Sequence, residues 1–193
     1  MKKQLLQHGW FIILLLLSVA CRQSPTGQEG AMPVVNPADN NGQPTVLYLV
    51  RHAEKDISDP SNENPGLTAE GTARAEALRS LLQEQEVDAL YATKYTRTKS
   101  TLIPLAEVKN LEIRQYEAHD FNGLRDKVLQ NDKGHTLVVA AHSNTLLPII
   151  EAFGAKRPVS DISELEYDYL FKITIAADGT ATVETSNYGK ASR

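Results

Sequence analysis

Thr-Val-Leu-Tyr-Leu-Val-Arg-His-Ala-Glu-Lys, residues 45–55, is the stretch of this chain from which its fold can be inferred. The first six residues are β-branched, aromatic or aliphatic and follow a proline, a pattern typical of a buried strand. The apolar run stops at Arg51 and His52, so a cation and an imidazole stand at the carboxyl end of that strand. In an open α/β sheet this end binds ligands, because loops and helix amino-termini with unpaired N–H groups converge there.

The composition indicates a globular protein with one domain. The chain has 193 residues, of which 41% are hydrophobic and 23% charged, and its formal net charge is −4. A mildly acidic chain is a poor nucleic-acid binder, so a local cluster of cations would have to bind any anion. The single cysteine, Cys21, excludes an internal disulfide and a cysteine-based zinc site. The histidines show no metal-binding spacing, and we expect neither a metal nor another cofactor.

Residues 1–20 have the layout of a secretory signal, with two early lysines, an apolar run over residues 10–17, and small residues directly before Cys21. The run is too short to cross a bilayer stably by itself. It resembles the lipobox of bacterial lipoproteins, with Ser18 where that pattern prefers leucine. The resemblance implies that Cys21 is acylated and anchors an exported protein to a bacterial membrane, on a periplasmic or surface-facing side. The alternatives are an uncleaved membrane anchor and a buried amino-terminal helix.

Residues 21–44 are rich in Gln, Ser, Pro, Gly and Asn and predict a flexible tether, which leaves residues 45–193 for the folded domain. Strands are expected over residues 45–50, 87–91, 111–116 and 136–141, and helices after Thr68, after Arg97, over 121–130 and over 145–153. Two alternating runs then flank Asp178-Gly179, a strong hairpin signal. This order predicts an α/β three-layer sandwich, with a mostly parallel central sheet flanked by helices and a C-terminal β-hairpin.

Two details of the helices are expected from their local patterns. Thr68 can cap the first helix, and its apolar face is predicted from residues 73, 77, 78, 81 and 82. Gly154 is expected to end the last helix in a left-handed conformation. Pro104 is expected near the first turns of the helix after Arg97, either as its start or as a kink, and Val108 belongs to the apolar positions of that helix.

Three of the predicted strand ends carry ionisable side chains. Arg51 and His52 follow the first strand, Arg97 the second and His142 the fourth. The carboxyl ends of parallel strands share one rim, so these side chains are expected in one pocket. Guanidinium groups match phosphoryl oxygens in bidentate geometry, which favours phosphate over a simple carboxylate. A neutral imidazole can attack phosphorus, and nearby arginines keep it neutral by lowering its pKa.

In these residues the sequence resembles the histidine phosphatase superfamily, also called the phosphoglycerate mutase-like family. The family's Arg-His-Gly signature appears here as Arg-His-Ala. The resemblance implies that His52 is the nucleophile that becomes phosphohistidine, and that Arg51, Arg97 and His142 bind the phosphoryl oxygens. The matching motifs follow one another in the expected order at residues 49–55, 67–71, 95–98 and 139–144.

The leaving oxygen needs a general acid, and the resemblance places it on the segment after the second arginine. Glu117 and Asp120 both lie there, and Glu117 is favoured. Members of the family that act on phosphohistidine can lack this acid, because an imidazole leaves readily. Glu54 and Lys55 are expected to form an exposed pair at the rim, and His119 is expected in a surface loop.

The predicted function is hydrolysis of a phosphomonoester, or of phosphohistidine, on a phosphorylated small molecule or phosphoprotein. The alternative is a non-catalytic, lipid-anchored module that binds phosphorylated ligands or a protein partner. Such a module would be expected to lack one of the four pocket residues, but the chain has all of them: Arg51, His52, Arg97 and His142. A serine hydrolase built on Ser143 would need glycines where Ala141 and Thr145 stand. A mutase is disfavoured, because short insertions around the pocket offer little to hold a substrate through two transfers.

Overall fold

The structure is a computed structural model that describes residues 42–192. The predicted signal segment, Cys21 and nearly all of the predicted tether lie outside these residues. Within residues 42–192, no helix has the length and apolar character that a membrane crossing requires.

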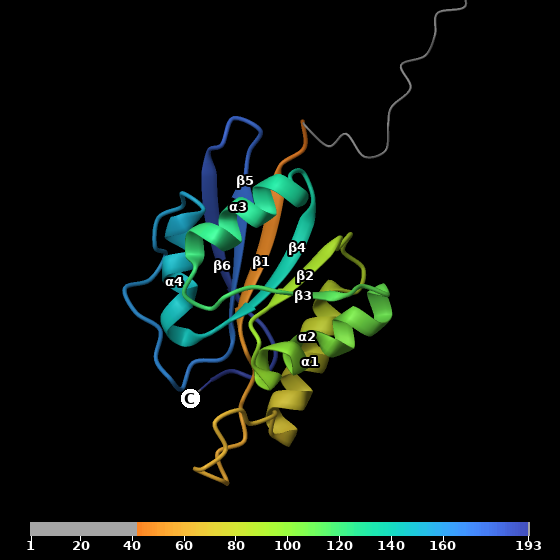
Figure 1. Cartoon of the computed structure of the whole chain (residues 1–193), viewed down its shortest axis with the longest axis vertical. Helices are drawn as coiled ribbons and strands as arrows, with labels where there is room; N and C mark the ends of the chain where they lie inside the picture. The colour runs from red at the N-terminus through yellow and green to blue at the C-terminus, as the bar shows by residue number, and fades with distance from the viewer. Residues whose placement is uncertain (1–41, 193) are drawn as a thin grey trace, which may run out of the picture. The chain divides into compact units, whose positions relative to one another are not determined.

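A six-stranded mixed sheet organises the described residues (Figure 1). The strand order is β3-β2-β4-β1-β5-β6. Strands β3, β2, β4 and β1 are parallel to one another, β5 pairs antiparallel with β1, and β6 pairs antiparallel with β5. The predicted α/β sandwich with its closing hairpin is therefore confirmed. The elements are β1 (Thr45–Arg51), α1 (Ala69–Leu82), β2 (Ala89–Ala92), α2 (Thr96–Lys109), β3 (Ile113–Gln115), α3 (Phe121–Asn131), β4 (Thr136–Ala141), α4 (Ser143–Ala152), β5 (Tyr169–Ile175) and β6 (Ala181–Asn187).

Alternate residues of β1 belong to two separate hydrophobic clusters, one on each face of the sheet. Leu47 and Leu49 pack in the cluster that contains Ile149 of α4, whereas Val50 packs in the cluster that contains Leu78 of α1. Figure 1 shows α3 and α4 on one side of the sheet and α1 and α2 on the other. Because both faces of β1 are covered by helices, side chains that point to either face are buried and apolar. This explains the continuous apolar run in the sequence.

The first helix is capped as predicted, but its buried face is different. The Thr68 hydroxyl accepts a hydrogen bond from the Gly71 N–H at 3.0 Å. Ala73 is exposed and Leu81 is 48% exposed, so this part of the predicted face is wrong. The helix instead turns Gly71 toward the main chain of Glu54, so closely that a Cβ there would lie 2.3 Å from the Glu54 oxygen. The buried residues of α1 are Gly71, Arg74, Ala75, Leu78 and Leu82.

Two other helices begin earlier than the sequence suggested. Helix α2 begins at Thr96, so Pro104 lies in its interior and does not mark its start, and Val108 is 52% exposed and not part of the buried face. Helix α4 begins at Ser143, with His142 as its N-cap residue. Gly154 follows α4 with a φ of 89°, the left-handed conformation predicted for it.

Candidate active site

The carboxyl ends of the parallel strands meet at a cavity of about 290 Å³. His52 follows β1, Arg97 lies in the first turn of α2 after β2, and His142 follows β4. Because Arg51 of β1 pairs with Ala141 of β4, the next residue on each strand is a histidine, and the two imidazole centroids lie 5.4 Å apart. The residues that line the cavity are His52, Lys55, Tyr95, Arg97, Ala118, His119, His142, Ser143, Asn144 and Glu164.

The His52 imidazole is buried, oriented and neutral. Its Nδ1 lies 2.8 Å from the carbonyl oxygen of Ala53, so the Nδ1–H donates there and the lone pair is left on Nε2. The pKa of His52 is lowered to about 3, chiefly by burial and also by the charges of Arg51, His142 and Arg97, which together outweigh the raising effect of the Ala53 bond. At neutral pH the ring is therefore uncharged, as a nucleophilic imidazole must be.

The tautomer of His142 follows from a chain of two threonine hydroxyls. The Thr98 hydroxyl lies 2.8 Å from the carbonyl oxygen of Tyr95, so its single proton is used there. The 2.9 Å contact between Thr93 Oγ1 and Thr98 Oγ1 then requires Thr93 to donate, and Thr93 accepts in turn from His142 Nε2–H at 3.1 Å. Burial and the nearby Arg97 lower the pKa of His142 to about 4. This ring too is neutral at pH 7.

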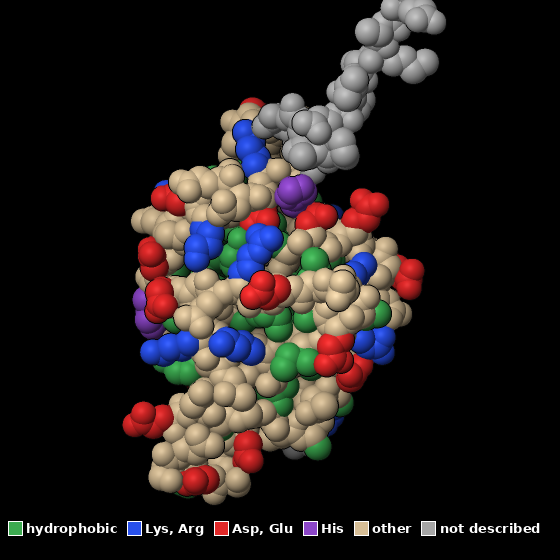
Figure 2. Space-filling model, turned by 45° about the vertical axis from the view of Figure 1, so that its right-hand side comes forward, with side chains coloured by type: hydrophobic (Ala, Val, Ile, Leu, Met, Phe, Trp, Pro, Cys, Tyr) green, Lys and Arg blue, Asp and Glu red, His purple; other side chains and the backbone are tan. Residues whose placement is uncertain are grey.

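Two guanidinium groups next to these rings have an unsatisfied donor. The Nε atoms of Arg51 and Arg97 are buried and have no hydrogen-bond partner among the described residues. Arg97 lies over the ring of Tyr95, with its Cζ 4.3 Å from the ring centroid, and burial lowers its pKa. A buried charged donor without an acceptor costs free energy, so a bound anion would relieve the cost. Figure 2 shows cationic and anionic side chains interspersed over the face it depicts.

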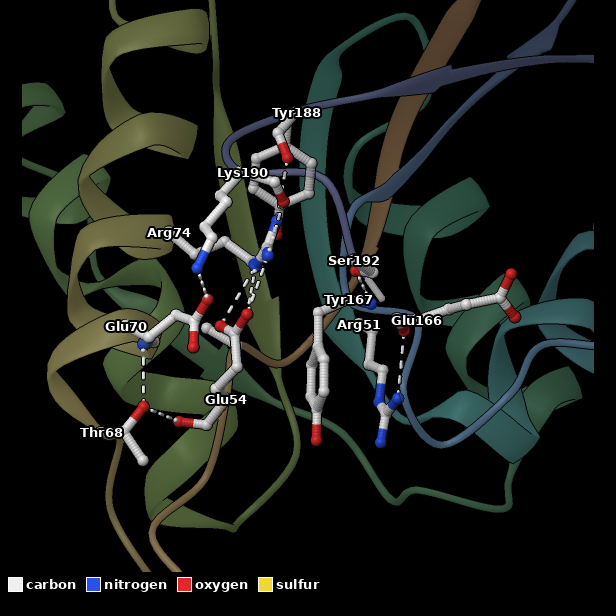
Figure 3. A network of polar contacts seen from close by, with 12 residues as sticks. Arg51, Glu54, Thr68, Glu70, Arg74, Glu166, Tyr167, Tyr188, Lys190 and Ser192 are labelled. Atoms are coloured by element: carbon white, nitrogen blue, oxygen red, sulfur yellow. Dashed lines mark hydrogen bonds and ion pairs between the residues drawn. The ribbon is translucent and has the colours of Figure 1, made fainter.

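Arg51 lies beside the cavity and is already bound to another segment of the protein. Its Nη1 donates to the carbonyl oxygens of Ser163 at 3.1 Å and Glu166 at 3.0 Å, and its Nη2 donates to the Glu164 carboxylate at 2.6 Å. The ring of Tyr167 lies against the guanidinium, 3.9 Å from Cζ (Figure 3). Arg51 is not among the lining residues, so the structure does not place it on the cavity wall with His52, Arg97 and His142.

The predicted proton donors, Glu117 and Asp120, are also absent from the cavity wall. The Asp120 carboxylate caps α3 by accepting the Gly123 N–H at 2.9 Å. Glu117 is exposed, and both residues line an adjoining cavity of about 240 Å³ that shares His119 with the first. Among the described residues that line the histidine cavity, Glu164 is the one carboxylate.

Several residues of the site were not found by sequence reasoning. Glu164 and Tyr167 lie in the irregular segment between α4 and β5, which has no periodicity that points to a site. His119 was expected only as a surface loop residue, but it also lines the cavity. The predicted exposed pair at the rim is wrong for Glu54, which bonds the buried Arg74 at 2.8 Å (Figure 3), while Lys55 lines the cavity.

No metal-binding cluster accompanies this site. Across residues 42–192, no group of three or more His, Cys, Asp or Glu side chains is arranged to hold a metal ion.

Known proteins share both the motifs and the fold. The family model for the histidine phosphatase superfamily (branch 1) matches residues 47–119, which include His52 and Arg97. The curated protein phosphoserine phosphatase 1 of Hydrogenobacter thermophilus is 29% identical over 92 residues, which are 46% of this chain but only 39% of that protein.

Solved structures extend the likeness over most of the chain. The protein histidine phosphatase SixA complexed with tungstate has a TM-score of 0.57 and 17% identity, covering 74% of this chain and 96% of SixA. Phosphoglycerate mutase from Bacillus anthracis str. Sterne has a TM-score of 0.55 and 14% identity, covering 76% of this chain and 94% of the mutase. At these identities the structures show a common fold. The family model also matches the motifs at the ends of β1 and β2, so this part of the chain is similar to the histidine phosphatase superfamily.

Proposed function

We propose that this domain hydrolyses phosphomonoesters, or phosphohistidine, through a covalent phosphohistidine on His52. The observation that carries the proposal is the state of His52, a neutral imidazole whose Nδ1–H is fixed and whose Nε2 keeps its lone pair beside a cavity with unsatisfied guanidinium donors. The match to the superfamily model and the phosphatase names among the similar proteins support the same class of reaction.

The reaction has two transfers of the phosphoryl group. First, His52 Nε2 attacks phosphorus and the bond to the leaving oxygen or nitrogen breaks. Water then attacks the phosphohistidine, the P–N bond breaks, and the electron pair returns to Nε2. Arg97 and the free Nε–H of Arg51 stabilise the charge on the phosphoryl oxygens, where positioning and electrostatics supply most of the rate enhancement. His142 adds a donor when its Nε2–H turns from Thr93 to the phosphoryl group.

The substrate is proposed to be a phosphorylated small molecule or a phosphoprotein. The names of two similar proteins, a phosphoserine phosphatase and a protein histidine phosphatase, support both kinds of substrate. We also propose that the domain is exported and tethered to a bacterial membrane through a lipid on Cys21, for the sequence reasons given above.

The test compares the full chain with its His52→Ala and His135→Ala variants on a panel of phosphomonoesters and a phosphohistidine peptide. His135 directly precedes β4, whereas His142 directly follows it, so His135 lies at the opposite end of that strand and is a matched control. We expect His52→Ala to lose all measurable turnover and a phosphoenzyme to form on the wild-type chain, while His135→Ala keeps its activity.

Equal turnover by the wild-type chain and His52→Ala would contradict the proposed mechanism. Absence of turnover by the wild-type chain, together with tight binding of tungstate, would instead support the non-catalytic module that binds phosphorylated ligands.

A further inference from the structure

We propose that Glu164 gives the proton to the leaving oxygen and later takes the proton of the attacking water, a role for which neither Glu117 nor Asp120 is placed. This inference rests on the proposed function. It identifies a further catalytic residue, which comes from the segment between α4 and β5 and not from the segment after the second arginine.

The position of the Glu164 carboxylate carries the proposal. It lines the cavity together with His52 and His142, and it lies close enough to His142 and Arg97 to affect the ionisation of both. The other two candidate carboxylates do not line this cavity: Asp120 caps α3, and Glu117 lines the adjoining cavity. A proton donor has to reach the reacting atoms before its acidity matters, so geometry favours Glu164.

The contacts of Glu164 fix the carboxylate at this position. One oxygen accepts from the Ser143 hydroxyl and the other from Arg51 Nη2 at 2.6 Å. The backbone on both sides is held as well, since Arg51 Nη1 donates to the carbonyl oxygens of Ser163 and Glu166. Arg51 is thus a positioning residue for this segment, in addition to offering its free Nε–H to the substrate. A side chain held by such contacts is pre-organised for proton transfer.

The proton balance of the cycle is complete with this one carboxyl group. In the first step His52 Nε2 bonds to phosphorus, the ester P–O bond breaks, and the leaving oxygen takes the proton of Glu164. In the second step water bonds to phosphorus and gives a proton to the Glu164 carboxylate, while the P–N bond breaks and its electron pair returns to Nε2. One water is consumed, alcohol and phosphate are released, and Glu164 is again protonated.

In the free protein the pKa of Glu164 is below its usual value, chiefly because Ser143 donates to the carboxylate and also because Arg51 and Lys55 are near. A bound phosphoryl group competes for the same cations and adds negative charge, and both effects raise the pKa of the carboxyl group. Because phosphomonoesters have a second pKa of about 6, the monoanion can bring the required proton into the site.

The experiment compares two substrates that differ in the stability of their leaving groups, using the full chain and Glu164→Gln. Benzyl phosphate expels an alkoxide and needs a proton donor, whereas 4-nitrophenyl phosphate expels a stable phenolate and does not. We expect kcat/KM of Glu164→Gln to fall about 10²-fold or more for benzyl phosphate and less than about tenfold for 4-nitrophenyl phosphate. The variant should also release a burst of nitrophenolate and accumulate an acid-labile phosphoenzyme, because its second step lacks a base.

Glu166→Gln is the matched control. Its carboxylate lies on the same segment, accepts the Ser163 N–H at 2.6 Å, and does not line the cavity. We expect it to leave the ratio of the two kcat/KM values unchanged, even if the segment is loosened. A purely structural role for Glu164 would lower both values together and leave that ratio unchanged as well.

An equal loss for both substrates in Glu164→Gln would therefore overturn the inference. So would a leaving-group-dependent loss in Glu117→Gln, Asp120→Asn or His119→Gln without one in Glu164→Gln, or a wild-type chain that hydrolyses 4-nitrophenyl phosphate but not benzyl phosphate. In each case His52→Ala stays inactive and the phosphohistidine mechanism stands. If His52→Ala is active, or the wild-type chain hydrolyses neither the two esters nor a phosphohistidine peptide, the proposed function itself fails.

Discussion

His52 and His142 follow two neighbouring strands, and both rings are neutral but make different hydrogen bonds. His52 donates from Nδ1 to its neighbour's carbonyl oxygen, whereas His142 donates from Nε2 to Thr93. Burial is the main cause of the low pKa of both rings, and the adjacent arginines add to it. Two imidazoles next to buried guanidinium groups are thus kept uncharged, as the proposed nucleophilic role of His52 requires.

The low pKa of His52 predicts how stability changes with pH. An unfolded histidine has a pKa of about 6.5, whereas that of folded His52 is about 3. Above pH 7 the ring is neutral in both states and contributes nothing. As pH falls below 6.5 the unfolded chain takes up a proton that the folded chain does not, so the free energy of unfolding decreases, by up to about 1.4 kcal/mol per pH unit, until pH approaches 3.

Urea titrations at several pH values check this expectation, with His52→Gln as the comparison. We expect the variant to lose less stability than the wild-type chain between pH 6.5 and pH 4, and an NMR titration to place the ionisation of the His52 ring below pH 5. An identical slope in both proteins would show that folding does not suppress protonation of His52.

Helix α1 packs against the residues that directly follow β1. Gly71 approaches the main chain of Glu54, and Arg74 donates to both oxygens of the Glu54 carboxylate. The Arg74 side chain is 2% exposed and that of Glu54 is 16% exposed, so this ion pair is largely shielded from water. Removing one partner leaves a buried charge without compensation.

Arg74→Met is therefore expected to destabilise the domain by about 3 kcal/mol. Arg79→Met on the same helix is the matched control, because its ion pair with Glu76 is solvent-exposed and worth about 1 kcal/mol or less. The double variant Glu54→Gln/Arg74→Met should recover part of the loss, since it removes the unpaired carboxylate. Denaturant unfolding measures all three, and an equal effect of Arg74→Met and Arg79→Met would contradict the argument.

In the folded domain, segments from both ends of the described chain meet at the end of β1. Arg74 donates to the carbonyl oxygens of Tyr188 and Lys190, and the Tyr167 N–H donates to Ser192 Oγ (Figure 3). The last residues thus pack beside the segment that carries Glu164. The site depends on a complete domain and not on the β1 motif alone.

For the chain as a whole, the proposed lipid anchor predicts a chemical modification. When the full chain is expressed in a bacterium that exports lipoproteins, radiolabelled palmitate should be incorporated, and mature protein should begin at Cys21 and partition into detergent. Cys21→Ser should take up no label and keep the mass of the uncleaved chain. Labelling of both proteins alike, or an unlabelled wild-type protein that keeps Met1, would contradict the anchor and favour an uncleaved segment.

Local chemistry was enough to infer the order of strands and helices and the histidines at the strand ends. The apolar run of β1, the Thr68 cap and the Asp178-Gly179 turn each depend on neighbouring residues, and parallel pairing then places His52 and His142 side by side. The alternation of strands and helices predicts a parallel sheet with one shared rim, whereas the strand order that makes β1 and β4 neighbours is a finding of the structure.

Contacts between segments that are distant in the sequence could not be predicted from local sequence patterns. Glu164 follows Arg51 by 113 residues and lies in a segment without hydrophobic periodicity. Its position at the cavity depends on the Arg51 guanidinium, which donates to two carbonyl oxygens and one carboxylate of that segment. The buried face of α1 likewise follows the Glu54–Arg74 ion pair and not the apolar residues alone. Loop conformations of this kind are set by partners across the fold, because no local hydrogen-bond pattern specifies them.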